Sequence, residues 1–161
     1  MKSLTTTQLY AWLEEVKDPE IPVLSLVDLG VITAVSMEGE TVNIEMTPTF
    51  VGCPALDIMK QEIVDVLKRH GVKEVHVTVS YRDPWSSDKI SEKGKRALKA
   101  FGLAPPPLGK VFTDLELLEH AQCPRCNNTN TEIKNVFGPT LCRSIHYCFD
   151  CKEAFEQFKP L

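Results

Sequence analysis

Residues 41–81, TVNIEMTPTFVGCPALDIMKQEIVDVLKRHGVKEVHVTVSY, decide the fold of the N-terminal part of the chain. Apolar and polar residues alternate in TVNIEMT (41–47) and again in EVHVTVSY (74–81), which is the pattern of half-buried strands. Between them, apolar residues at helical spacing predict a helix over 54–70 with Pro54 as its first residue. Strand, helix and strand then form a βαβ crossover.

The neighbouring segments extend this unit on both sides. The β-branched run VITAVSM (31–37) predicts a strand that pairs with 41–47 as a hairpin. A threonine run precedes an amphipathic helix over 6–16, and Ser86 and Ser87 can cap a helix that ends at Phe101. We therefore expect an α+β fold, a small mixed sheet with a hairpin, a βαβ crossover and helices, followed by a four-cysteine module.

The proline run APPP (104–107) cannot continue a helix and predicts a stiff boundary. We expect an α/β domain over 1–103, a linker with a short helix over 104–120, and a metal-binding ribbon over 121–161.

Composition excludes several classes of protein. The 161 residues are 43% hydrophobic and 25% charged, with a net charge of −4, which is typical of a globular protein and gives no basic patch for nucleic acid or a membrane surface. The N-terminus has no apolar run of the length that a signal peptide or membrane helix needs. We expect a cytoplasmic protein, and in that reducing compartment clustered cysteines favour metal binding over disulfides.

Five of the six cysteines fall between 123 and 151. Two C-x-x-C pairs, Cys123/Cys126 and Cys148/Cys151, are separated by 21 residues, the pattern of a tetrahedral thiolate site. This gap is slightly longer than the roughly 15–20 residues usual between the two pairs of a zinc site, and the excess fits a hairpin loop at 137–139. A module of this size needs metal ligation to fold, and zinc or an iron–sulfur cluster both fit four thiolates.

The fifth cysteine of this module and the histidines of the chain do not have the clear metal-ligand spacing of the two C-x-x-C pairs. Cys142 and His146 are either alternate ligands or buried residues beside the site, and the second reading is the commoner one. His70, His76 and His120 have no ligand spacing, and we expect structural roles for all three.

Cys53 stands apart from the other cysteines. If Pro54 opens the helix, Cys53 is its N-cap, where free N–H groups and the helix dipole lower a thiol pKa. Gly52 allows close backbone approach, and Thr47 and Thr49 bring two hydroxyls to the same loop. The alternative is a buried cysteine under a helix start. Residue types alone do not separate the two.

Asp18-Pro19-Glu20 admits a similar choice. Asp18 either caps a turn, or both carboxylates approach the Cys53 loop and contact a cation. The turn cap is the commoner of the two.

The runs DPEIPVLSLVDLGVI (18–32), TPTFVGCP (47–54) and RDPW (82–85) resemble the small iron–sulfur assembly factors that include the SufT-type proteins. The C-terminal extension resembles one subgroup, the D subunits of the bacterial phenylacetyl-CoA epoxidase, or phenylacetate-CoA oxygenase, system. The motif residues that this resemblance transfers to the chain are Asp18, Glu20, Thr47, Thr49, Gly52 and Cys53.

The resemblance implies a non-catalytic accessory protein of phenylacetate degradation. It would assemble or mature the iron or iron–sulfur centres of the epoxidase and its iron–sulfur reductase, which are then its partners. Cys53 would hold iron or a cluster transiently. The oligomeric state stays open, a homodimer among the alternatives.

Two other functions stay open at this point. A zinc-ribbon adaptor would act only by docking, and its near-neutral ribbon favours a protein partner over nucleic acid. Cys53 as an enzyme nucleophile would need a base, and no histidine lies near it in sequence.

Overall fold

The computed structural model describes residues 4–107 and 121–160. Contacts group the chain into two compact units, residues 1–85 and 86–161. The first contains helix α1 (Thr6–Leu13), strands β1 (Ile32–Glu38) and β2 (Thr41–Met46), helix α2 (Leu56–Arg69) and strand β3 (Glu74–Val79). The second contains the 3-10 turn η1 (Ser87–Lys89), helix α3 (Glu92–Phe101) and strands β4 (Leu103–Ala104), β5 (Thr131–Asn135), β6 (Arg143–Cys148) and β7 (Glu153–Phe158).

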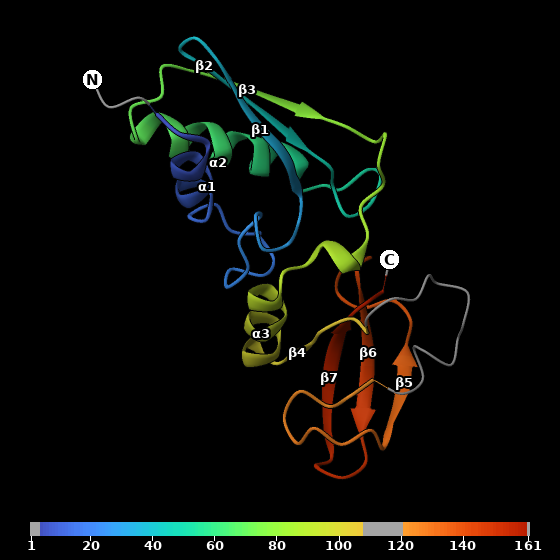
Figure 1. Ribbon diagram of the computed structural model, residues 1–161. Coiled ribbons are helices and arrows are strands. Elements are labelled where there is room, and N and C mark those ends of the chain that lie inside the picture. The colour runs from blue at the N-terminus through green and yellow to red at the C-terminus, as the bar shows by residue number, and fades with distance from the viewer. Residues whose placement is uncertain (1–3, 108–120, 161) are drawn as a thin grey trace. The chain divides into compact units, whose positions relative to one another are not determined.

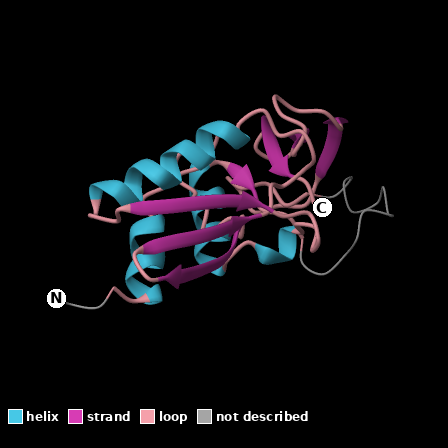
Figure 2. Cartoon of the chain, turned by 90° about the horizontal axis from the view of Figure 1, so that it is seen from above, coloured by secondary structure: helices cyan, strands magenta, loops and turns pink. Residues whose placement is uncertain are grey.

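The first unit has the predicted mixed sheet. Its strand order is β1-β2-β3, with β1 antiparallel and β3 parallel to β2. Figure 1 shows α1 and α2 against the same face of this sheet, and Figure 2 shows its three strands side by side. The alternation in β2 turns apolar side chains toward the helices, and these form a core with both helices: Leu9, Leu13, Val42, Ile44, Met46, Met59, Ile63 and Leu67.

The helices begin or end differently from the prediction at three places. Helix α1 has the expected threonine cap, Thr5, but stops at Leu13 because the N–H groups of Glu15 and Val16 bond three residues back instead of four. Helix α2 begins at Leu56 with Ala55 as its N-cap. Pro54 instead lies in a turn closed by a 3.2 Å bond from the Leu56 N–H to the Cys53 carbonyl oxygen.

Helix α3 starts later than predicted, since Ser91 is its N-cap and accepts from the Gly94 N–H at 2.9 Å. Ser86 and Ser87 belong to η1, after which Ile90 is extended and buried. The predicted stop is confirmed, because Gly102 ends the helix with φ +92°.

The second unit is built on a sheet with the order β4-β7-β6-β5. Strands β5, β6 and β7 are antiparallel neighbours, and β4 pairs with β7 in parallel. The predicted hairpin loop at 137–139 joins β5 to β6. In the structure α3 and β4 therefore group with the ribbon. The predicted domain limits at 103 and 120 stay predictions, and the short helix predicted within 104–120 lies outside the described residues.

Candidate metal centre and cysteine loop

The four cysteines of the two C-x-x-C pairs come together in the second unit. One ligand atom from each of Cys123, Cys126, Cys148 and Cys151 lies within 4.8 Å of all the others. The sulfurs of Cys123 and Cys151 are 3.7 Å apart, and those of Cys126 and Cys148 are 3.5 Å apart. Cys123 and Cys148 are fully buried, packed with Ala104, Ala121 and Phe155. The predicted convergence of the four thiols is confirmed.

Each cysteine pair is held by the same backbone turn. The residue after the second cysteine has a left-handed backbone in both turns, with φ 63° at Asn127 and φ 59° at Lys152. In the first turn the Asn127 N–H donates to the Cys123 carbonyl at 2.9 Å. Asparagine tolerates this backbone, whereas a lysine adopts it at a higher cost.

The donor set fits a tetrahedral metal ion. Zinc–sulfur bonds of about 2.3 Å place neighbouring sulfurs about 3.8 Å apart in a tetrahedron, close to the 3.7 Å between Cys123 and Cys151 and the 3.5 Å between Cys126 and Cys148. N–H groups of Cys151 and Asp150 donate to the Cys148 sulfur and lower the pKa of Cys148 to about 7. Burial raises the pKa of Cys151 to about 12, so full ionisation of the set calls for a cation among the four sulfurs.

Cys142 and His146 lie outside this group of four. The Cys142 sulfur is 3.1 Å from the Thr140 hydroxyl. His146 is buried, its Nε2 is 2.8 Å from the Ser144 hydroxyl, and its ring stacks on Phe155 at a centroid distance of 5.4 Å. Burial lowers the pKa of His146 to about 4, so its ring is neutral at pH 7. Both residues have the buried positions that the sequence favoured.

The histidines of the first unit also have structural contacts. The Nε2 of His70 is 2.6 Å from the Glu15 carboxylate, and its ring stacks on Trp12 at 4.6 Å. His76 is exposed beside Glu74 at 3.2 Å. His120 lies outside the described residues.

The Cys53 loop connects β2 to α2 in the first unit. Thr47 is buried and its N–H donates to the Val31 carbonyl at 2.8 Å, while Thr49 is half-buried farther along the loop. Gly52 has φ +81°, and a Cβ added there would meet nothing within 4 Å. The glycine is therefore required for its backbone angle, and the space beside it is open, so the close approach of another group stays a prediction.

The thiol of Cys53 differs from the sequence prediction. Cys53 is not the N-cap of α2, although the N–H groups of Ala55 and Leu56 do donate to its sulfur. Burial raises the pKa of Cys53 above its ordinary value of 9.0, and the negative charges of Asp18 and Glu20 raise it further. The expected lowering is wrong because burial and two carboxylates outweigh two backbone donors.

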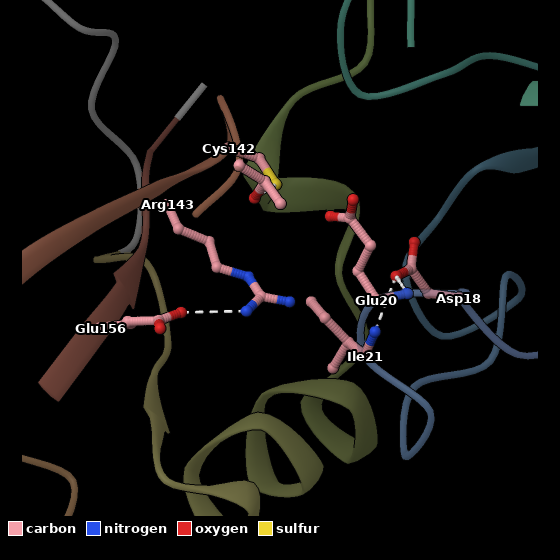
Figure 3. Close-up of polar contacts among 7 residues, drawn as sticks. Asp18, Glu20, Ile21, Cys142, Arg143 and Glu156 are labelled. Atoms are coloured by element: carbon pink, nitrogen blue, oxygen red, sulfur yellow. Dashed lines mark hydrogen bonds and ion pairs between the residues drawn. The ribbon is translucent and has the colours of Figure 1, made fainter. Parts of the chain in front are cut away.

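The Asp18-Pro19-Glu20 segment has the turn cap that one interpretation expected, and the contact with a cation that the other expected stays a prediction. Asp18 Oδ1 accepts from the N–H groups of Glu20 and Ile21, both at 2.9 Å, so Asp18 caps a turn, as Figure 3 shows. The same carboxylate and that of Glu20 lie close enough to Cys53 for their charges to act on its thiol. Among the described residues, the charged groups that act on Cys53 are these two, so the structure supplies it with acidic neighbours and not with a histidine base.

Two contacts in the first unit were missed by sequence reasoning. Trp85 is buried, and its indole N–H donates to the Leu29 carbonyl at 2.9 Å. The Ser25 hydroxyl accepts from the Asp28 N–H and donates to the Glu14 carboxylate, both at 2.9 Å. Polar residues inside the apolar run LSLVDLG were a signal for such a network, and Trp85 after Asp-Pro was a signal for an aromatic anchor.

Comparison with known proteins identifies both parts of the chain. A family model described as "iron-sulfur cluster assembly protein" matches residues 6–80, and the "PaaD zinc beta ribbon domain" matches residues 109–159. The candidate D subunit of 1,2-phenylacetyl-CoA epoxidase from Escherichia coli K12 is 32% identical over 94% of this chain and 91% of its own length. The chain belongs to the PaaD family. The chain joins an iron–sulfur assembly domain to a zinc-ribbon-like module.

Other relatives of this PaaD-family chain match a little over half of it. The iron–sulfur protein maturation auxiliary factor YitW of Bacillus subtilis is 38% identical over 53% of this chain and 85% of its own length. A crystal structure of a domain of unknown function from Bacillus anthracis is 35% identical, with a TM-score of 0.54 over 57% of this chain and 89% of that one. The predicted resemblance to iron–sulfur assembly factors is confirmed.

Among residues 4–107 and 121–160, no helix is both long and apolar enough to cross a membrane.

Proposed function

We propose that this PaaD-family protein is a non-catalytic cytoplasmic accessory factor that matures the iron or iron–sulfur centres of a phenylacetyl-CoA epoxidase and its reductase. The observation that carries the proposal is the pair of carboxylates, Asp18 and Glu20, acting on the Cys53 thiol. The names of the relatives, an epoxidase subunit and a maturation factor, support the choice of client.

The raised pKa of Cys53 suits transient binding of iron. With no cation nearby, the sulfur keeps its proton at neutral pH, and the thiol is a weak nucleophile and a weak ligand. When an iron cation or cluster arrives, the sulfur–iron bond forms as the proton leaves to solvent. Asp18 and Glu20 attract the cation, while Thr47, Thr49 and Gly52 shape the loop that presents the sulfur.

In this proposal the four-cysteine ribbon holds zinc as a structural ion. All four positions are taken by thiolates, and two of the sulfurs are fully buried. Closed thiolate sites of this kind are typical of structural zinc. Elemental analysis after anaerobic purification should give one zinc per chain without a visible absorption band, whereas iron and sulfide with charge-transfer bands would assign a cluster to the ribbon instead.

A second candidate function is a docking adaptor that uses the ribbon alone. One observation favours it: a thiol whose pKa is raised is poorly disposed to bind metal at neutral pH. In that case Cys53 is a half-buried structural residue, and the acidic neighbours serve the turn capped by Asp18.

A substitution of Cys53 separates the two functions. The epoxidase and reductase proteins are produced together with wild-type, Cys53→Ser or Cys142→Ser accessory protein, and their iron, sulfide and visible spectra are measured. The maturation role predicts that Cys53→Ser lowers client iron while Cys142→Ser, the matched control at a buried cysteine, leaves it unchanged. Full client iron with Cys53→Ser would leave the adaptor as the function.

A further inference from the structure

Two lysines of the ribbon lie over aromatic rings but differ in their charge partners. Lys134 Nζ lies 5.6 Å from the ring centre of Phe149, and its ion pair with Glu132 is 2.6 Å long. Lys159 Nζ lies 5.4 Å from the ring centre of Phe137. Within the part of the chain that the structure describes, no carboxylate pairs with Lys159.

The two lysines also differ in burial, which decides how much a missing carboxylate partner matters. The Lys134 side chain is 48% exposed, so water solvates its charge whether or not Glu132 is present. Lys159 is only 6% exposed, and a buried charge without a partner is unfavourable. Burial lowers the pKa of the Lys159 ammonium, an effect that the neighbouring Cys142 sulfur opposes. An anion brought to Lys159 would be stabilised far more than one brought to Lys134.

The loop beside Lys159 exposes apolar side chains in a fixed arrangement. Phe137 is 64% exposed and Leu141 is 58% exposed. The Phe137 N–H donates to Asn135 Oδ1 at 2.9 Å, and the Gly138 N–H donates to the Arg143 carbonyl at 2.8 Å. Gly138 packs so closely there that an added Cβ would lie 3.1 Å from Arg143. The loop is thus ordered before any partner binds, which reduces the entropy lost on association.

We propose that Phe137, Leu141 and Lys159, together called the hairpin tip, bind a segment of a partner protein that carries a carboxylate next to an aliphatic side chain. The carboxylate pairs with Lys159 as Glu132 pairs with Lys134. The aliphatic side chain packs on Phe137 and Leu141, and the buried position of Lys159 makes the contact specific. This goes beyond the proposed function, because it uses none of the residues around Cys53.

Selection of short random peptides on the immobilised full-length, metal-loaded chain tests the proposal. Parallel selections use Lys159→Met and, as the matched control, Lys134→Met. We expect peptides with Asp or Glu beside Leu, Ile or Val to be enriched on the wild type and on Lys134→Met, and not on Lys159→Met. Enrichment without acidic residues, or equally on all three proteins, would overturn the proposal.

Affinities of one enriched peptide then decide the matter by fluorescence polarisation. Lys159→Met should weaken binding by about tenfold or more, and Lys134→Met by less than about twofold. Phe137→Ala, at an exposed position, should also weaken binding, and this variant decides the result if Lys159→Met loses its metal. Unchanged affinity in Phe137→Ala would refute binding at the hairpin tip. Competition by inorganic phosphate for the enriched peptide would also refute it if none of the enriched peptides is acidic. Cys53→Ser should bind like wild type, so the result is independent of the maturation role.

Discussion

The two cysteine regions of this chain place sulfur in opposite surroundings. In the ribbon, four thiols converge within 4.8 Å, and backbone donors lower the pKa of Cys148 to about 7. In the loop before α2, burial and two carboxylates raise the pKa of Cys53, which belongs to no such group of ligands among the described residues. Convergent thiolates retain a metal, whereas a single protonated thiol binds one only by losing its proton. The proposed function therefore assigns lasting ligation to the ribbon and transient binding to Cys53.

The largest effect should come from removing the ribbon metal. A strong chelator, or the substitution Cys126→Ser, should unfold residues 121–160, because metal ligation contributes on the order of 10 kcal/mol to folding in small zinc modules. The amide resonances of residues 4–80 should keep their dispersion in NMR spectra, because that unit has its own core. Cys53→Ser is the control and should leave the ribbon folded. A ribbon that keeps its dispersed resonances without metal would remove the distinction between the two regions.

The next effect tests how the Cys53 loop is held. Gly52→Ala should destabilise the first unit by roughly 1–2 kcal/mol, because alanine is strained at positive φ. The φ of +81° and the empty space around the position make this a purely backbone effect. Denaturant unfolding measures it, and Gly52→Asn should be less harmful because asparagine tolerates this conformation. Equal stability of all three proteins would show that the loop does not depend on its left-handed turn.

A smaller effect of opposite sign is expected in the ribbon. Lys152 holds the left-handed conformation that Asn127 holds in the other cysteine turn. Lys152→Asn should therefore stabilise the metal-loaded ribbon by about 0.5–1 kcal/mol, since it relieves part of the cost of positive φ. The reverse substitution, Asn127→Lys, should destabilise it by a similar amount in thermal unfolding. No change in either variant would mean that the metal alone fixes both turns.

The elements and the metal cluster were predictable because their signals are local or repeated. Alternation predicted β2 and β3, the β-branched run 31–37 predicted the first strand of the hairpin, and two C-x-x-C pairs predicted four convergent sulfurs. The Asn127 turn was also predictable from the tolerance of asparagine for positive φ.

The surroundings of Cys53 were not predictable, because they depend on residues far away in sequence. Pro54 correctly marked the region of the helix start, but a shift of two residues moved the N-cap from Cys53 to Ala55. The pKa of Cys53 then depends on burial and on Asp18 and Glu20, which are more than thirty positions away in the chain. A tertiary contact of that kind leaves no periodic signal in the sequence. The role of these residues in binding stays a prediction.

The smallest effect, and the most direct test of the comparison, is the ionisation of Cys53 itself. Glu20→Gln removes one of the two negative charges and should lower the pKa of the thiol toward its ordinary value. Alkylation by iodoacetamide, followed at Cys53 by mass spectrometry across a pH series, should then reach half its maximal rate at a lower pH than in the wild type. Glu20 is chosen over Asp18 because the Asp18 carboxylate also caps the turn. The raised pKa also makes the stability of the fold depend on pH. The protonated thiol is favoured in the folded state, so its stabilising contribution is complete below the pKa that Cys53 has in the unfolded chain. That contribution is lost as the pH rises through the pKa that Cys53 has in the folded chain. Glu62→Gln, at an exposed carboxylate farther along α2, should leave the alkylation profile unchanged. An unchanged profile in Glu20→Gln would mean that burial alone protonates Cys53, and the acidic pair would then lose its proposed part in attracting the iron.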